Sequence, residues 1–211
     1  QYQLPLSPEE SIKYTQVPVG FRMELFASEP EIINPIYMTW DERGRLWVVE
    51  TVDYPNEFKD GRKGNDRIKI CEDTNSDGKA DKFTVFAEGF NIPTSMTFAR
   101  GGVILAHAPE FYFLKDTNGD DKADIKEVLF SGWGVGDTHA GPSNLRYGFD
   151  NWIYGTVGYA RFNGSLGGKQ HNFGMGVFRF KSDASDIEFL HQFNNNTCLL
   201  YTSPSPRDQR G

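Results

Sequence analysis

The stretch Asp73-Thr74-Asn75-Ser76-Asp77-Gly78-Lys79-Ala80-Asp81 recurs at residues 116–124 as DTNGDDKAD. Each copy has oxygen-bearing side chains at positions 1, 3, 5 and 9, the ligand spacing of a calcium loop of EF-hand type. A hard cation needs several oxygen ligands around one point, and alternate residues of a tight loop supply them. The repeat therefore predicts two calcium loops with these ligands, in which the lysines stand at position 7: Asp73, Asn75, Asp77, Lys79 and Asp81 in the first, and Asp116, Asn118, Asp120, Lys122, Asp124 and Glu127 in the second.

Each copy departs from the full calcium-loop pattern at one position. Position 12, a bidentate glutamate in that pattern, is Glu127 in the second copy and Thr84 in the first. Position 6, where the chain bends sharply, is Gly78 in the first copy and Asp121 in the second. Aspartate tolerates a left-handed backbone less well than glycine. The competing interpretation is a pair of Asp/Asn-rich turns that bind no metal, and the sequence leaves it open.

Strands, rather than the helices of an EF-hand, flank both loops. The flanking segments are short, rich in β-branched and aromatic residues, and alternate with a period of two. They are residues 67–71 and 82–86 around the first loop, and residues 111–114 and 125–130 around the second. Each loop is therefore expected to join the two strands of a β-hairpin.

A second repeat predicts how these hairpins are arranged. Residues 35–48, 93–105 and 142–154 each contain a proline, then apolar and aromatic residues, then a tight turn and another apolar strand. The first two copies are each followed by one loop-bearing hairpin, which makes a four-stranded unit the size of a β-propeller blade. The third copy is expected to continue into strands at the segments 176–180 and 187–190, with a Gly-rich loop at 161–172. The predicted fold class is all-β: a truncated β-propeller of about three four-stranded blades, since a closed propeller has about 4–8.

The two ends of the chain differ from its centre. Residues 1–19 are expected to be a lead-in with a short helix, which Ser7 begins as N-cap and Glu10 stabilises through a capping box. Residues 20–27 then alternate as a strand, and the partial propeller domain is expected to span residues 20–197. Residues 198–211 are expected to be an artefactual tail, because the sequence CLLYTSPSPRD resembles the translation of a sequencing adapter.

The composition argues against several classes of partner. The net charge of −7 disfavours nucleic acid and anionic membrane surfaces. No apolar run approaches the length of a membrane span. Without the tail Cys71 is the only cysteine, so the cysteine count does not indicate a redox compartment.

Three segments together resemble a known family. Residues 5–11 (PLSPEES), 17–21 (VPVGF) and 41–50 (DERGRLWVVE) resemble the N-terminal propeller of the membrane-bound dehydrogenases of planctomycetes and related bacteria. The resemblance covers about residues 5–197 and implies a propeller related to the glucose/sorbosone dehydrogenases, which use pyrroloquinoline quinone. It also implies a periplasmic or extracellular protein whose full-length chain continues into helical repeats and a c-type cytochrome segment. This sequence holds no CxxCH motif, so no haem site is assigned to it.

The catalytic candidate implied by this resemblance is His139. It lies in the loop sequence DTHAGP, directly before the third copy of the strand repeat. In the quinone-dependent sugar dehydrogenases a histidine at such a place takes the hydroxyl proton as hydride leaves for the quinone, and histidine suits this task because it titrates near neutral pH. The spacing to the strand is one residue longer than in that family, and the usual Gly-Pro-Asp-Gly turn is replaced by GFDN at residues 148–151. The competing interpretation is a histidine that hydrogen-bonds the loop backbone.

Two further residues are candidates for cofactor binding. His107 ends the second strand of the second unit, and Glu50 and Asp53 hold the equivalent place in the first, so the recurring polar residues indicate a shared site. Arg161 follows the equivalent strand of the third unit and could bind a carboxylate of a quinone or an acidic sugar. The simpler interpretations are strand-end packing for His107 and a solvated side chain for Arg161.

Two functions are compatible with these features. The first is a domain of a propeller-type dehydrogenase that oxidises a sugar or polyol with a quinone-type electron acceptor and carries structural calcium. The second is a non-catalytic, calcium-stabilised propeller that binds a glycan or a partner protein. The blades beyond this sequence would distinguish them, because a quinone site needs several basic residues.

Overall fold

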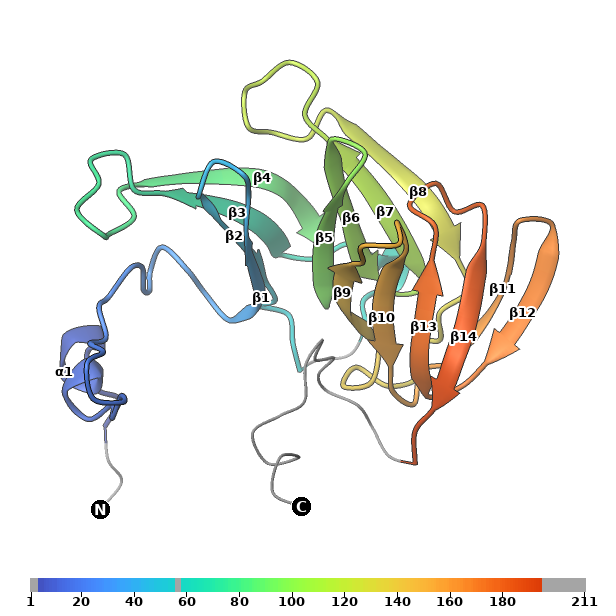
Figure 1. Cartoon of the computed structure of the whole chain (residues 1–211), viewed down its shortest axis with the longest axis horizontal. Coiled ribbons are helices and arrows are strands. Elements are labelled where there is room, and N and C mark those ends of the chain that lie inside the picture. The colour runs from blue at the N-terminus through green and yellow to red at the C-terminus, as the bar shows by residue number, and fades with distance from the viewer. Residues whose placement is uncertain (1–3, 56–57, 195–211) are drawn as a thin grey trace.

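The computed structural model describes residues 4–55 and 58–194. Its strands form three four-stranded antiparallel sheets and one two-stranded hairpin (Figure 1). The bounds are β1 Pro35–Trp40, β2 Leu46–Glu50, β3 Asp66–Glu72 and β4 Lys82–Phe90 in the first sheet, β5 Ser95–Ala99, β6 Gly102–His107, β7 Glu110–Lys115 and β8 Ile125–Ser131 in the second, and β9 Pro142–Tyr147, β10 Ile153–Val157, β13 Gly176–Phe180 and β14 Ile187–Gln192 in the third. The fold is therefore all-β and propeller-like, with three blades, as the sequence predicts.

The blades pack face to face through two apolar clusters. Between the first and second blades, the ring of Trp47 meets Phe86 and Phe98 edge to face, with centroids 4.6 and 5.2 Å apart. Between the second and third blades, the fully buried rings of Phe111 and Phe178 belong to a larger aromatic cluster. Each fully buried ring contributes roughly 1.5–3 kcal/mol through removal of apolar surface from water. The alternation of the strands supplies these faces, because every second side chain points toward the neighbouring blade.

The first strands of the three blades lie next to one another. The N–H of Leu145 in β9 donates to the Ser95 hydroxyl of β5 at 2.9 Å. The Tyr37 hydroxyl of β1 donates to the Leu145 carbonyl at 3.2 Å and accepts from Arg146 at 3.1 Å. These contacts hold β1, β5 and β9 around a common centre, where propellers place their ligand sites.

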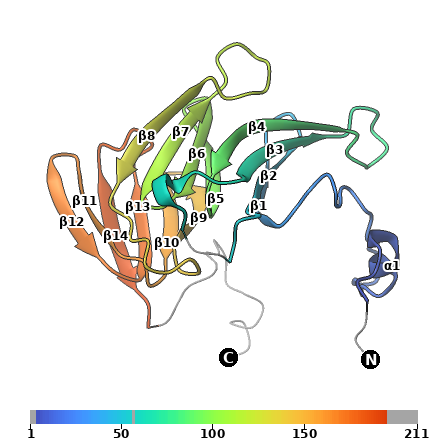
Figure 2. The ribbon, with the colours of Figure 1, turned by 180° about the vertical axis from the view of Figure 1, so that it is seen from behind.

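Both predicted loops connect the third and fourth strands of their blades. Residues 73–81 join β3 to β4, and residues 116–124 join β7 to β8. Both loops project away from the sheets (Figures 1 and 2).

The lead-in helix forms as predicted. It is α1 (Pro8–Lys13), and Ser7 and Glu10 form the capping box. No helix in the described part of the chain is long and apolar enough to cross a membrane. The predicted tail, residues 198–211, lies outside the described residues.

Two predictions of secondary structure are wrong. Residues 161–172 are largely a hairpin of β11 (Phe162–Leu166) and β12 (Lys169–Phe173), not a loop. The Gly167-Gly168 pair that suggested a loop is its two-residue turn, with φ of 56° and 74°. Residues 21–28 have no regular secondary structure, because a strand needs a neighbour for its backbone hydrogen bonds and none lies beside this segment in the described structure.

Candidate functional site

A cavity of about 520 Å³ lies where the first strands of the three blades begin. Tyr37 of β1, Thr94 before β5 and Asn144 of β9 line it, together with the loop that enters β9. The cavity is thus built from all three blades rather than from one.

His139 lines this cavity from the loop between β8 and β9. Its side chain is 61% exposed, and its ring lies edge to face on Tyr54 with a centroid distance of 5.3 Å. The Asp137 carboxylate accepts the backbone N–H of His139 at 2.7 Å and lies 3.3 Å from its Nδ1. A carboxylate beside Nδ1 favours the tautomer that carries its proton there, which leaves Nε2 as a proton acceptor.

Polar groups line the cavity beside apolar side chains that include Ile36, Met38 and Ile92. Arg146 brings a guanidinium group, which donates to the Tyr37 hydroxyl at 3.1 Å. Burial raises the pKa of Tyr37, so its hydroxyl stays protonated at neutral pH. Asn144 is buried with a left-handed backbone (φ 56°), and its amide donates to the Ser143 hydroxyl at 3.1 Å. The cavity therefore offers a cation, hydroxyls and an amide, which are partners for a polyhydroxylated ligand.

The structure does not bring His107 to this cavity. The side chain is only 1% exposed, and its Nε2 accepts the backbone N–H of Asn91 at 3.2 Å. Burial, together with the positive charges of Arg62 and Lys126, lowers the pKa of His107 to about 3. The imidazole is thus neutral and holds the segment between β4 and β5.

Glu50 and Asp53, the equivalents of His107 in the first blade, are buried too, and both form ion pairs. Glu50 binds Arg67 at 2.5 Å and Lys69 at 3.3 Å. Burial alone would raise the pKa of Asp53, but hydrogen bonds from groups that include Lys59, at 2.6 Å, hold its pKa at about 2. The recurrence of polar residues at this point of the blades reflects packing in the structure rather than a shared open site.

Arg161 lines a separate cavity of about 510 Å³ beside the β11–β12 hairpin, with Tyr159 and Phe189 among its neighbours. The three site residues predicted from the sequence, His139, His107 and Arg161, therefore lie in three different environments. The cavity also contains three residues that were not predicted from the sequence: Tyr54, Arg146 and Asn144. The signal for Asn144 and Arg146 was their place in the third strand repeat, two and four residues after its proline.

The two predicted calcium loops fold alike. Each has a left-handed residue at position 4 (Ser76, φ 62°; Gly119, φ 83°) and at position 6 (Gly78, φ 87°; Asp121, φ 64°). In each, the position-1 carboxylate accepts the N–H of position 6 at 2.8 Å.

The acidic side chains of these loops are held mainly by the loops themselves. The position-9 carboxylates, Asp81 and Asp124, accept the hydroxyl protons of Thr74 and Thr117 at 2.8 and 2.6 Å. Glu127 lies in β8 opposite Phe113. Within residues 4–55 and 58–194, no group of three or more His, Cys, Asp or Glu side chains is arranged to hold a metal ion. Calcium binding stays a prediction.

Residues 7–205 match a family described as a domain of unknown function (DUF7133). The chain belongs to this family. The matched range reaches into the segment predicted to be an artefactual tail, which stays a prediction.

No curated protein matches the chain. Among solved structures, a crystal structure from Thermus thermophilus, provisionally described as an oxidoreductase (glucose dehydrogenase), is similar with a TM-score of 0.40 and 19% identity. The match covers 59% of this chain and 39% of that chain, and such similarity does not define an activity.

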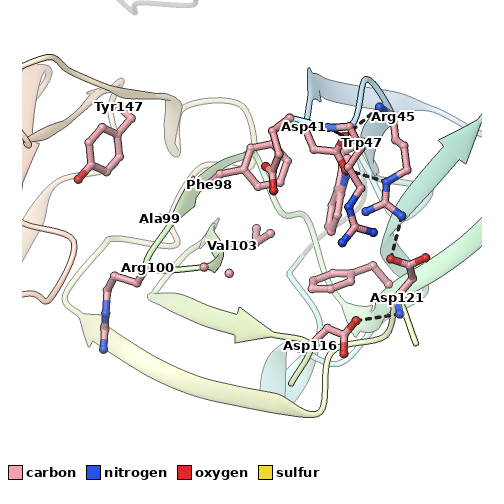
Figure 3. Close-up of a pocket in the computed structure, with 15 residues that line it drawn as sticks. Asp41, Arg45, Trp47, Phe98, Ala99, Arg100, Val103, Asp116, Asp121 and Tyr147 are labelled. Carbon is pink, nitrogen blue, oxygen red and sulfur yellow. Dashed lines mark hydrogen bonds and ion pairs between the residues drawn. The ribbon is translucent and has the colours of Figure 1, made fainter. Parts of the chain in front are cut away.

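The DUF7133 chain has a second inter-blade cavity, of about 480 Å³, at the opposite ends of the first strands. Arg45 lies between the first two blades here (Figure 3). Its guanidinium binds Asp41 of its own turn and Asp121 of the second loop, both at 2.8 Å. Burial alone would lower the pKa of Arg45, but these carboxylates raise it. The aspartate at position 6 of the second loop thus ties that loop to the first blade.

Proposed function

We propose that the cavity around His139 binds the hydroxyl groups of a sugar or polyol, and that His139 removes a hydroxyl proton during oxidation of the alcohol. The observation that carries this proposal is the position of His139 in a cavity built from the first strands of three blades, with Asp137 beside its Nδ1. The domain would then be part of a propeller-type dehydrogenase.

The chain's own residues supply binding, orientation and proton acceptance in this proposal. Tyr37 and Arg146 bring a hydroxyl and a guanidinium group to the cavity for hydrogen bonds with substrate oxygens. The imidazole Nε2 accepts the hydroxyl proton, and Asp137 beside Nδ1 stabilises the imidazolium that results. The exposure of His139 allows the proton to pass to water after each turnover.

The electron acceptor must come from elsewhere. Pyrroloquinoline quinone is a polycarboxylate, and Arg146 is the one Lys or Arg side chain lining this cavity in the described structure. Arg161, the predicted carboxylate ligand, belongs to a different cavity. The described residues therefore do not fit this quinone by themselves.

Structural calcium in the two loops is the second part of the proposal. The shared backbone conformation of the loops and their duplicated oxygen spacing support it. Calcium would bind the position-1, -3 and -5 side chains and reduce the repulsion between their charges.

The activity is tested with the full-length protein, a panel of sugars and polyols, and an artificial redox dye as acceptor. We expect His139→Ala to lower kcat by about 10²–10⁴-fold, the usual cost of removing a general base. The matched control is His191→Ala, an exposed histidine of β14, which should leave kcat unchanged. Near-normal turnover of His139→Ala would show that His139 is not the base. Saturable glycan binding without any turnover of the wild type would instead favour the non-catalytic propeller.

A further inference from the structure

Residues 21–27 (FRMELFA) precede the first blade and belong to no sheet of the described structure. The Phe26 carbonyl accepts the N–H of Ala80 in the first loop at 2.9 Å. Its ring meets Trp40 edge to face at 5.5 Å and packs on the cluster of Leu46, Val48 and Cys71. Phe26 is therefore anchored to the first blade by specific contacts, while residues 21–24 are exposed and the segment lacks a neighbouring strand in the described structure.

The same contacts recur between the first and second blades. There the carbonyl of Phe86 accepts the N–H of Ala123 at 2.8 Å. Ala80 and Ala123 both stand at position 8 of their loops. Phe86 belongs to β4, the fourth strand of the first blade. Residues 24–27 (ELFA) also resemble residues 84–87 (TVFA) in sequence.

The apolar surfaces under the two phenylalanines are equivalent as well. Leu46 pairs with Cys71 across β2 and β3, as Val103 pairs with Leu114 across β6 and β7. Phe26 packs on the first pair and Phe86 on the second. Phe26 thus lies on the first blade as Phe86, in the fourth strand of the first blade, lies on the second. Its place corresponds to the fourth strand of a blade that would precede the first.

We infer that residues 21–27 are the fourth, outermost strand of the propeller's last blade. The three inner strands of that blade would come from the polypeptide beyond the three blades described. The ring would then be closed by backbone hydrogen bonds between an N-terminal strand and a C-terminal sheet. This inference does not depend on the proposed function.

The first blade leaves a face exposed that the last blade of the ring would cover. Met96 of β5 is 0% exposed because the first blade covers it, whereas its equivalent in β1, Met38, is 65% exposed. Trp47 of the first blade inserts between Phe86 and Phe98. The equivalent pair, Phe26 and Trp40, has no side chain between its members in the described structure, since the two rings touch each other.

The occupant must offer a three-stranded sheet with a free edge. A second copy of this chain does not, because β4, β8 and β14 already fill the fourth position of its three blades. A whole blade with four strands of its own would leave residues 21–27 unpaired. Only a blade that lacks its outer strand uses both the segment and the exposed face.

Amide hydrogen exchange of the full-length protein tests the inference. At a concentration at which light scattering shows a monomer, we expect the peptide 21–28 to exchange at least about 100-fold more slowly than the lead-in peptide 14–19, since paired strand amides are protected. Exchange at the same rate in both peptides would overturn the inference. Protection that appears only when the protein dimerises would overturn it too, because a second copy would then be the occupant.

A proline variant adds an independent measurement. Leu25→Pro removes one backbone donor from the segment and disfavours strand pairing, so the protection of peptide 21–28 should fall to that of 14–19 and Tm should drop. The matched control Gln16→Pro, in the lead-in, should change neither. If Leu25→Pro fails to fold, the exchange of the wild type still decides. An unchanged Tm and unchanged protection in Leu25→Pro would count against the strand.

Discussion

The buried imidazole of His107 makes the stability of the domain dependent on pH. Its pKa is about 3 in the folded chain, against about 6.5 for an unperturbed histidine. The unfolded chain therefore binds a proton that the folded chain does not, so the contribution of His107 is complete above pH 6.5 and is lost as the pH falls toward 3. We expect the free energy of unfolding to fall by up to about 1.4 kcal/mol per pH unit in this window.

Urea unfolding at pH 7.0 and 4.5 measures this dependence. His107→Gln keeps an acceptor for the N–H of Asn91 and removes the titrating group, so its unfolding free energy should change less between the two pH values. Asp53, whose folded pKa is about 2, contributes stability that is lost mainly below its unfolded pKa of 3.8. Asp53 therefore contributes little to the pH dependence above pH 4.5, and the comparison with His107→Gln isolates the share of the histidine from that of Asp66, whose pKa burial raises. An identical pH slope in wild type and variant would contradict the assignment.

Contacts between residues of different blades could not be predicted from the sequence. Asp121 looked like a defect at position 6 of the second loop, yet its carboxylate binds Arg45 of the first blade at 2.8 Å. No local pattern links residues 45 and 121, because their contact depends on how two blades pack. Tyr54 was missed at the cavity for the same reason. His139 was found because its loop directly precedes a recognisable strand repeat.

Most strands were predictable because their period-two patterns are bounded by turns. β3, β4, β7 and β8 appear where the flanks of the duplicated loops placed them. The hairpin β11–β12 was missed because its strands contain polar residues and glycine, and their stability depends on Phe162 and Phe173 stacking at 5.1 Å beside Trp133. The strand predicted at residues 20–27 does not form despite its alternation, because no strand lies beside this segment in the described structure. Local pattern thus identifies a strand, while its pairing depends on the rest of the molecule.

The duplicated loops predict that calcium stabilises the domain. Binding to the folded state alone adds RT ln(1 + [L]/Kd), or about 2.7 kcal/mol per site at 100-fold excess over Kd. Asp73→Ala and Asp116→Ala remove the position-1 ligand of one loop each, so each should abolish about half of the rise in unfolding free energy. Tm measured with calcium and with a chelator, together with calorimetric titration, checks this.

Measurements in chelator separate the loss of a calcium ligand from damage to the loop itself. Asp73 and Asp116 also accept backbone N–H groups, so their variants should lower Tm somewhat even in chelator. Thr84→Glu adds the missing twelfth carboxylate to the first loop and should tighten calcium binding if that position is a ligand. If calorimetry shows no heat of binding for the wild type, both loops are metal-free turns.

At the scale of the whole molecule, the three blades form an arc in which the outer face of the first blade is more exposed than the inner interfaces (Figure 1). The inner interfaces bury aromatic clusters, whereas the first blade leaves Ile36, Met38 and Trp40 largely exposed. An exposed apolar face of this kind marks an interaction site or an aggregation hazard. The open arc also leaves the cavity of His139 with walls from three blades, so activity is expected from the full-length protein rather than from this chain.

Equivalent methionines on the covered and uncovered faces allow a direct test of this asymmetry. Met96 is 0% exposed, so Met96→Ala in this chain should lower the free energy of unfolding by about 2–5 kcal/mol, the usual cost of a core cavity. Met38 is 65% exposed, so Met38→Ala should change it by less than about 0.5 kcal/mol. In the full-length protein a closing blade would bury Met38 as the first blade buries Met96, and both substitutions should then cost a similar amount. Urea unfolding of the four variants, two in each length of chain, gives the comparison. A Met38→Ala substitution that stays neutral in the full-length protein would mean that this face remains open to solvent and that the ring is not closed through the first blade.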